Sequence, residues 1–249
     1  MIRVLRPLPV ESLKLLVFDL DGTLIDSAQD LCNSVNATLV HFGRPALPDE
    51  IIAGYIGNGA LLLVNRALSH NHPGPCDDAF LARAHQFFIE YYREHKLDYT
   101  SAYYGVVEAL QALRNLHEQT SAAAPNAAPR SMAVLTNKPV RPAQAICQAL
   151  GLAPFFLNIY GGNSFATKKP NPEGLLALMQ KAGASPQQTV MIGDSQVDIQ
   201  TARNAGAWAI GCTFGLAPET LRAVPPDVLV DSPAEWTAAL SPARIAVEP

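Results

Sequence analysis

Two aspartates follow the first strongly apolar run of the chain. Asp19 and Asp21 come directly after residues 13–18, with a glycine behind them. Side chains of an extended chain alternate between two faces, so both carboxyls are expected to point the same way, opposite to Leu20. Two neighbouring carboxylates repel unless a cation offsets their charge. Mg²⁺ suits such a pair, because it prefers oxygen ligands and is usually held by one or two carboxylates with waters and phosphate oxygens. A solvated Asp-Gly turn explains the same residues, so the motif alone leaves both interpretations open.

Polar residues with complementary chemistry occur in three later segments. They are Thr136, Asn137 and Lys138, then Lys168 and Lys169, then Asp194, Ser195 and Asp198. A hydroxyl and successive backbone N–H groups in the first segment could hold phosphate oxygens, and a lysine of the second would neutralise phosphate charge. Asp194 follows a glycine and stands where a metal ligand would be. Asp198 fits the first turn of a helix, where a negative charge also has a purely structural explanation.

Strand and helix patterns alternate around these segments. Strands are predicted at residues 13–18, 131–135, 158–160, 189–192, 208–212 and 228–230, with helices at 140–150, 172–182 and 198–205. Repeated βα units imply an α/β fold with a doubly wound parallel sheet that helices cover on both faces. Ligands of such sheets bind beyond the carboxyl ends of the strands. The polar segments fall at predicted strand ends or at the start of a helix, so we expect them to share one crevice.

The segment between residues 27 and 95 has helical periodicity and no strand pattern. A helix is predicted to follow Ser27, a candidate N-cap, and to end at Gly43. Shorter helices are predicted at about 49–55 and 60–68, and a long helix is predicted to begin after Asp77. A glycine-containing loop, Gly57-Asn58-Gly59, separates two of them. We therefore expect an α/β core domain made of residues 1–26 and 96–249, with an all-helical domain of residues 27–95 inserted into it.

Composition argues against several classes of protein. The 249 residues include 18 basic and 22 acidic ones, for a net charge of −4. Because no long basic run occurs, a nucleic-acid or acidic membrane surface is not expected. No stretch approaches the roughly 18 apolar residues of a membrane span, and the start lacks a signal-peptide pattern. The four cysteines are far apart, which favours reduced thiols in a cytoplasmic protein. They are Cys32, Cys76, Cys147 and Cys212.

Two further features carry little chemical information. His70 and His72 form a close pair, but two histidines in a loop without a third ligand are a weak indication of a metal site. A helix is predicted at residues 106–117, and the small-residue and proline-rich segment 120–129 after it is expected to be an exposed, mobile loop.

The motifs are far more specific together than singly. They are Asp-x-Asp-Gly-Thr at 19–23, Thr-Asn at 136–137, Lys-Pro at 169–170 and Gly-Asp-x-x-x-Asp at 193–198. In this order they resemble the haloacid dehalogenase-like superfamily of phosphohydrolases, over about residues 13–240. Residues 24–27, Leu-Ile-Asp-Ser, resemble the branch in which a helical cap is inserted at that point. Residues 18–27, 56–60, 136–139 and 193–195 are most similar to the bacterial phosphoglycolate phosphatases of that branch.

The resemblance implies a division of labour between the first two aspartates. Asp19 would be the nucleophile, which attacks phosphorus to give an aspartyl-phosphate. Asp21 would protonate the leaving alkoxide and then activate the water of the second step. Asp194 would complete a Mg²⁺ site with Asp19 and the backbone carbonyl of Asp21.

The resemblance also implies the groups that hold the transferring phosphoryl oxygens. These would be Thr136, the N–H of Asn137 and the ammonium of Lys169. Lys169 is preferred to Lys168 because the lysine of the family directly precedes a proline, as Lys169 does here.

Two supporting roles are also predicted. Asp198, with its neighbour Ser195, would support the metal through a water or orient Lys169. The loop Gly57-Asn58-Gly59 offers backbone N–H groups and an amide, and is expected to contact the non-phosphate end of the substrate. A plain turn between two helices explains the same loop.

The expected function is that of a Mg²⁺-dependent phosphatase of a small phosphorylated metabolite, with 2-phosphoglycolate hydrolysed to glycolate and phosphate as the first candidate. The alternatives are a related capped phosphatase acting on a sugar phosphate or a pyrophosphate, and a non-catalytic phosphate-binding protein on the same fold. The protein is expected to be a monomer or a homodimer.

Overall fold

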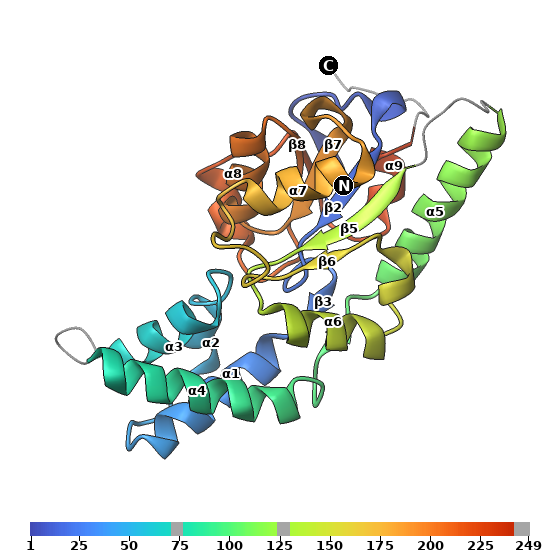
Figure 1. Cartoon of the computed structure of the whole chain (residues 1–249). Coiled ribbons are helices and arrows are strands. Elements are labelled where there is room, and N and C mark those ends of the chain that lie inside the picture. Colours follow the sequence, from blue (N-terminus) through green and yellow to red (C-terminus); the bar gives the residue numbers. More distant parts are fainter. Residues whose placement is uncertain (71–76, 124–129, 242–249) are drawn as a thin grey trace.

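A parallel sheet forms the centre of the larger part of the molecule (Figure 1). The computed structural model describes residues 1–70, 77–123 and 130–241. Within these residues, seven strands form one sheet in the order β1-β9-β8-β7-β2-β5-β6. They are β1 (Arg3–Val4), β2 (Leu15–Phe18), β5 (Ser131–Leu135), β6 (Ile159–Tyr160), β7 (Thr189–Gly193), β8 (Trp208–Cys212) and β9 (Val228–Val230). All neighbours are parallel except β1 and β9, so the predicted doubly wound α/β sheet is confirmed, with an antiparallel edge strand added.

Helices cover both faces of the sheet. Consecutive side chains of β2 point to opposite faces, so each face of this strand packs against a different set of helices. Leu16 and Phe18 pack with α5 (Val106–Ala123), α6 (Val140–Ala149) and α9 (Glu235–Ala239). Leu15 and Val17 pack with α7 (Glu173–Ala182) and α8 (Gln196–Ala205). An all-apolar strand such as β2 is therefore buried on both sides, as parallel sheets require.

Strand register brings the functional segments to one edge of the sheet. Phe18 pairs with Val134 of β5 on one side and with Ile192 of β7 on the other. The residues that follow these three positions therefore leave the sheet at the same level. This alignment places the loops that begin at Asp19, Thr136 and Asp194 beside one another.

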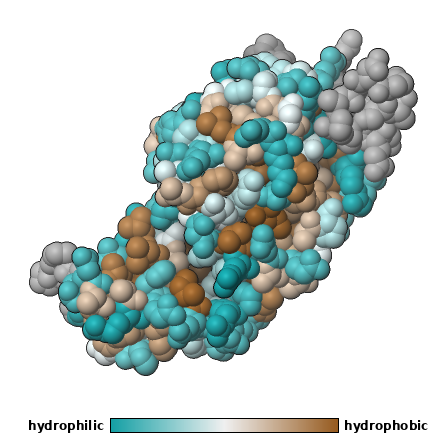
Figure 2. Space-filling model, viewed as in Figure 1, coloured by the Kyte–Doolittle hydropathy of each residue, from teal (hydrophilic) through white to brown (hydrophobic). Residues whose placement is uncertain are grey.

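A separate group of helices forms the smaller lobe of the molecule, below the sheet in Figure 1. Its members are α1 (Ala28–His41), α2 (Asp49–Ala53), α3 (Ala60–Ser69) and α4 (Asp78–His95). They bury their own apolar cluster, which includes Val35, Ile52 and Phe88. Asp77 caps α4 as predicted, since its carboxylate accepts a hydrogen bond from the N–H of Phe80 at 3.0 Å. We call α1–α4 the helical lobe. Figure 2 shows brown, hydrophobic surface on this lobe and beside it on the larger part of the molecule.

The chain leaves and re-enters the sheet-containing part through two short paired strands. β3 (Ile25–Asp26) pairs antiparallel with β4 (Ser101–Ala102). Next to them, the buried carboxylate of Asp30 in α1 accepts hydrogen bonds from the N–H groups of Tyr99 and Thr100. β1, β3 and β4 were not predicted, because a strand of two residues is too short to show an alternating pattern.

One loop prediction was partly wrong. Helix α5 extends to Ala123, so residues 120–123 are helical rather than part of the expected loop. Ala122 and Ala123 favour the helix there, because alanine has the highest helix propensity. Residues 124–129 lie outside the described part of the chain. The remaining regular segments are short 3₁₀ turns, at Val10–Ser12, Ala153–Phe155, Pro186–Gln188 and Pro218–Arg222.

Three of the cysteines are buried free thiols, Cys32, Cys147 and Cys212. Cys76 and His72 lie outside the described residues, while the ring of His70 is hydrogen-bonded to the hydroxyl of Tyr55 at 2.8 Å. Among the helices described here, none combines the length and the apolar character that crossing a membrane requires.

Candidate active site

A cleft of about 430 Å³ lies between the carboxyl ends of the central strands and the helical lobe. The sheet side contributes Asp19, Asp21, Thr136, Asn137, Lys138, Asp194 and Ser195. The helical lobe contributes mainly apolar side chains, among them Leu31, Leu63 and Phe88, with Tyr92. Three of the four polar segments predicted from the sequence therefore line one cleft. Lys169 of the fourth segment is not among the lining residues, but its Nζ lies 2.8 Å from Asp19.

Asp19 lies at the floor of this cleft, directly after β2. Its N–H donates to the carbonyl of Ile192 at 2.8 Å, which continues the ladder between β2 and β7 by one residue. Its Oδ1 accepts hydrogen bonds from the N–H of Leu20 at 2.7 Å and is 2.8 Å from the Nζ of Lys169. Both donors bind the same oxygen, so Oδ2 takes no hydrogen bond from the residues that the structure describes.

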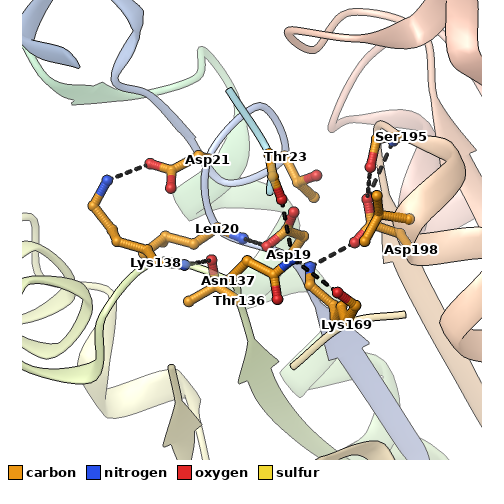
Figure 3. Close-up of polar contacts among 12 residues, drawn as sticks. Asp19, Leu20, Asp21, Thr23, Thr136, Asn137, Lys138, Lys169, Ser195 and Asp198 are labelled. Carbon is orange, nitrogen blue, oxygen red and sulfur yellow. Dashed lines mark hydrogen bonds and ion pairs between the residues drawn. The ribbon is translucent and has the colours of Figure 1, made fainter. Parts of the chain in front are cut away.

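Lys169 is buried between two carboxylates. Its Nζ lies 2.8 Å from Asp19 and 2.6 Å from Oδ1 of Asp198. The other oxygen of Asp198 accepts from the N–H and the hydroxyl of Ser195, at 3.1 Å and 2.8 Å. Because both oxygens of Asp198 are engaged, its carboxylate is held in one orientation and fixes the ammonium of Lys169 next to Asp19 (Figure 3).

Asp194 completes the acidic group from the end of β7. Its Oδ2 accepts hydrogen bonds from the N–H groups of Leu216 and Ala217, at 2.7 Å and 3.1 Å. The hydroxyl of Thr23 lies 3.5 Å from its Oδ1. Asp194 is 3% exposed, so this carboxylate is held by main-chain donors inside the protein.

Glycines allow the backbone to approach these carboxylates closely. A Cβ on Gly193 would lie 2.2 Å from the carboxyl carbon of Asp198. A Cβ on Gly22 would lie 2.2 Å from Oδ2 of Asp194, and Gly22 also has a φ of +80°, which side chains disfavour. The glycines of the two motifs are thus required by packing around the acids.

The acidic group has the composition of a site for a hard cation. Oxygens of Asp19, Asp194 and Asp198 lie within 4.8 Å of one another, and all three residues are buried. Burial raises the pKa of Asp19 to about 8, with Lys169 opposing the rise and the other two aspartates adding to it. Burial, followed by the charge of Asp198, raises the pKa of Asp194 to about 7. A cation bound here would offset both causes, so the donor set fits a divalent metal.

Asp21 faces a different direction from Asp19, although both line the cleft (Figure 3). The sequence predicted parallel side chains for an extended chain, but β2 ends at Phe18 and the chain bends at Leu20. The Oδ1 of Asp21 lies 2.7 Å from the Nζ of Lys138 and accepts a hydrogen bond from the hydroxyl of Ser27 at 2.5 Å.

Two residues of this arrangement received no chemical role from the sequence. Lys138 is the third residue of the Thr136-Asn137-Lys138 segment, and its burial beside a carboxylate is visible only in the fold. Ser27 was expected to cap a helix. It stands at that position before α1, but its side chain makes no capping hydrogen bond and turns to Asp21 instead.

The residues predicted to hold phosphate lie at the end of β5. The hydroxyl oxygen of Thr136 accepts a hydrogen bond from the N–H of Lys138 at 3.2 Å, which leaves its own proton available to another acceptor. The amide of Asn137 donates to the carbonyls of Gly57 and Lys169, at 3.0 Å and 3.1 Å. Asn137 therefore joins the loop of the helical lobe to the lysine beside Asp19.

The loop Gly57-Asn58-Gly59 reaches the cleft mainly through its backbone. Gly57 and Gly59 line the cleft. The side-chain oxygen of Asn58 accepts a hydrogen bond from Arg66 at 2.8 Å, and its carbonyl accepts one from Lys168 at 2.8 Å. Of the two adjacent lysines, Lys169 thus lies beside Asp19, and Lys168 contacts the helical lobe.

This geometry agrees with a comparison against known protein families. The model of a family described as haloacid dehalogenase-like hydrolase matches residues 16–212, which include Asp19, Asp21, Lys169 and Asp194. The chain belongs to the haloacid dehalogenase-like hydrolases.

Relatives of this hydrolase share most of its length. A protein of Chromobacterium violaceum named phosphoglycolate phosphatase is 38% identical over 227 residues, which are 91% of this chain and 96% of the relative. One of the same name from Pseudomonas putida is 39% identical over 204 residues, 81% of this chain and 70% of the relative. The crystal structure of a predicted phosphoglycolate phosphatase from Haemophilus somnus has a TM-score of 0.80 at 31% identity, and the match covers 91% of this chain and 97% of the other.

Proposed function

We propose that this hydrolase is a Mg²⁺-dependent phosphatase whose preferred substrate is 2-phosphoglycolate, which it hydrolyses to glycolate and phosphate. The observation that carries the proposal is the buried group at the end of the sheet, in which Lys169 holds Asp19 beside Asp194. The names of the relatives from Chromobacterium violaceum and Pseudomonas putida support the choice of substrate.

In the first chemical step, Oδ2 of Asp19 attacks phosphorus, and the bond between phosphorus and the ester oxygen breaks. Oδ2 is the attacking oxygen because Oδ1 is engaged by Leu20 and Lys169. Asp21 gives a proton to the departing alkoxide. The product is glycolate and an aspartyl-phosphate.

In the second step a water attacks the phosphorus of the aspartyl-phosphate, and Asp21 accepts the proton of that water. The bond between phosphorus and Oδ2 of Asp19 breaks, which releases phosphate and regenerates the carboxylate. In both steps the ammonium of Lys169 offsets the negative charge of the phosphoryl oxygens, and the hydroxyl of Thr136 and the N–H of Asn137 donate hydrogen bonds to these oxygens.

Asp19, Asp194 and the backbone carbonyl of Asp21 would hold the Mg²⁺ ion. When bound, the ion supplies positive charge next to the phosphoryl group and offsets the repulsion among the acids. Asp198 is assigned the task of orienting Lys169, because its oxygens are occupied by Lys169 and Ser195.

The helical lobe, residues 27–95, would act as the cap domain over a core of residues 1–26 and 96–249. It excludes bulk water from the cleft and contacts the non-phosphate end of the substrate through the loop Gly57-Asn58-Gly59. A cytoplasmic location is supported by the buried free thiols of Cys32, Cys147 and Cys212. The protein is expected to act as a monomer or a homodimer.

A panel of phosphorylated metabolites assayed with Mg²⁺ tests the proposal. It should contain 2-phosphoglycolate, several sugar phosphates and pyrophosphate. The highest kcat/KM is expected for 2-phosphoglycolate. A higher value for a sugar phosphate or for pyrophosphate would replace the substrate but keep the reaction class, and the absence of phosphate release from every ester would refute a phosphatase.

A further inference from the structure

Lys138 is buried in the cleft, yet the proposed reaction gives it no task. It is 6% exposed, although lysine is among the residues least often buried without a partner. Its main chain is fixed at both ends of the residue. The N–H donates to the hydroxyl oxygen of Thr136 at 3.2 Å, and the carbonyl accepts from the N–H of Gly162 at 2.8 Å.

The ammonium of Lys138 binds one particular oxygen of Asp21. The distance from Nζ to Oδ1 is 2.7 Å, and the hydroxyl of Ser27 donates to the same oxygen at 2.5 Å. Oδ2 of Asp21 receives no hydrogen bond from any described residue. Since Asp21 lines the cleft, two donors on Oδ1 hold the carboxyl so that Oδ2 remains open for exchange of a proton with a ligand.

The same ammonium also contacts the helical lobe. Its Nζ lies 4.8 Å from the centroid of the ring of Tyr92, which belongs to α4 and is 3% exposed. This distance is within the range of a cation–π interaction, which is strongest where water is excluded. Ser27, the other donor to Asp21, directly precedes α1 of the lobe. Both donors to Asp21 are therefore connected to the lobe, one by packing and one through the chain.

We propose that Lys138 is a positioning residue for Asp21, which it holds by Oδ1 so that Oδ2 meets the leaving-group oxygen when the helical lobe covers the cleft. This inference rests on the proposed role of Asp21 as the proton donor. It predicts that loss of Lys138 lowers the rate constant for release of a leaving group more strongly when that leaving group needs a proton.

The test compares two esters in a single turnover of the full-length protein with Mg²⁺. The alkoxide released from 2-phosphoglycolate needs a proton, whereas the p-nitrophenolate released from p-nitrophenyl phosphate departs without one. In Lys138→Met, the rate constant for release of the alkoxide should fall by about 100-fold or more, as expected for lost general acid catalysis. The rate constant for release of p-nitrophenolate should fall by less than about fivefold, because Asp19 and Lys169 are unchanged.

Lys138→Arg and Tyr92→Leu keep the test valid if Lys138→Met does not fold, which circular dichroism would reveal. Arginine keeps a positive charge next to Asp21, so the rate constant with 2-phosphoglycolate should be at least about tenfold higher in Lys138→Arg than in Lys138→Met. Tyr92→Leu removes the ring but not the ion pair. It should give a smaller loss with the same dependence on the leaving group.

Lys168→Met is the matched control, because Lys168 also joins the sheet side to the helical lobe but has a carbonyl rather than a carboxylate as its partner. It should change both rate constants by the same factor. Equal losses for both esters in Lys138→Met and Tyr92→Leu would overturn the inference, and so would unchanged rates. If the unsubstituted protein releases neither leaving group, the proposed function has failed instead.

Discussion

The two ends of the sheet carry buried aspartates in opposite electrostatic situations. At the carboxyl end, the carboxyls of Asp19, Asp21, Asp194 and Asp198 are accompanied by two buried lysines, Lys138 and Lys169. At the amino end, the single carboxyl of Asp227, directly before β9, is bound by two arginines. The first group has more acids than bases, and the second has more bases than acids.

The pKa values of the aspartates differ between the two ends in the same way. Although burial raises it, hydrogen bonds from Arg203, Arg6 and the N–H of Ala209 hold the pKa of Asp227 below its ordinary value. Burial raises the pKa of Asp19 and of Asp194 despite the nearby lysine. A buried aspartate that is fully paired stabilises the fold, whereas an under-compensated group of aspartates is costly for the fold and ready to receive a cation.

The largest effect should come from exchanging the carboxyl at each end for an amide. Asp19→Asn should lower turnover of 2-phosphoglycolate by at least about 1,000-fold, because the attacking oxygen is lost, and leave the protein folded. Asp227→Asn should keep turnover and lower the free energy of unfolding by about 2 kcal/mol, because Arg6 and Arg203 lose a charged partner. Turnover assays and thermal unfolding of both variants measure this. Full activity of Asp19→Asn would contradict the assignment of the nucleophile.

Removal of the metal should affect only the carboxyl end. EDTA should abolish turnover, and added Mg²⁺ should restore it. Mg²⁺ at 100 times its dissociation constant should stabilise the protein by about 2.7 kcal/mol, since it binds the folded state alone. The midpoint of thermal unfolding should rise with Mg²⁺ in the unsubstituted protein and in Asp227→Asn, but not in Asp194→Asn. Turnover that persists in EDTA would refute the metal site.

The pH dependence of stability should have opposite signs at the two ends. A carboxyl with a raised pKa binds its proton more tightly when folded, so its contribution to the free energy of unfolding falls as pH rises. For Asp194 this occurs between its ordinary pKa of 3.8 and about 7. Asp227, with a lowered pKa, instead contributes stability above the ordinary value and loses it as pH falls through the lowered pKa.

Thermal unfolding of the metal-free protein between pH 3 and pH 8 checks these signs. Asp194→Asn should unfold a few degrees above the unsubstituted protein at pH 8, with a smaller difference at pH 5. Asp227→Asn should unfold at a lower temperature at pH 8, and the deficit should shrink toward pH 3. A deficit of Asp194→Asn at pH 8 would mean that its carboxylate is not costly for the fold.

The smallest effect is expected at Asn58, which stands between Gly57 and Gly59, two residues that line the cleft. Its side-chain oxygen is bound by Arg66, so only part of the amide can face a ligand. Asn58→Ala should raise KM for 2-phosphoglycolate by about threefold, or about 0.6 kcal/mol, and change kcat little. KM values for three unrelated esters provide the comparison. An equal change for all of them would argue against contact between Asn58 and the non-phosphate end.

Most of the fold followed from local pattern, because strands and helices of ordinary length leave a period in the sequence. The apolar run at residues 15–18, buried on both faces, and the long helix α4 that begins after Asp77 are examples. Two-residue strands such as β3 and β4 leave no period. The end of α5 was placed too early, because the small residues at 120–123 have no apolar period that separates a helix from a loop.

The sequence by itself predicted which residues would carry the chemistry. Asp19, Thr136 and Asp194 occur in motifs at strand ends, which parallel strands in register bring to one edge, and Lys169 occurs in a motif ahead of a helix. Only the tertiary structure decided how these groups pair. The bend after β2 turns Asp21 away from Asp19, and Lys138, in the loop after β5, comes within 2.7 Å of Asp21. Such pairings depend on the directions of side chains from segments far apart in the chain, and spacing along the sequence does not record those directions.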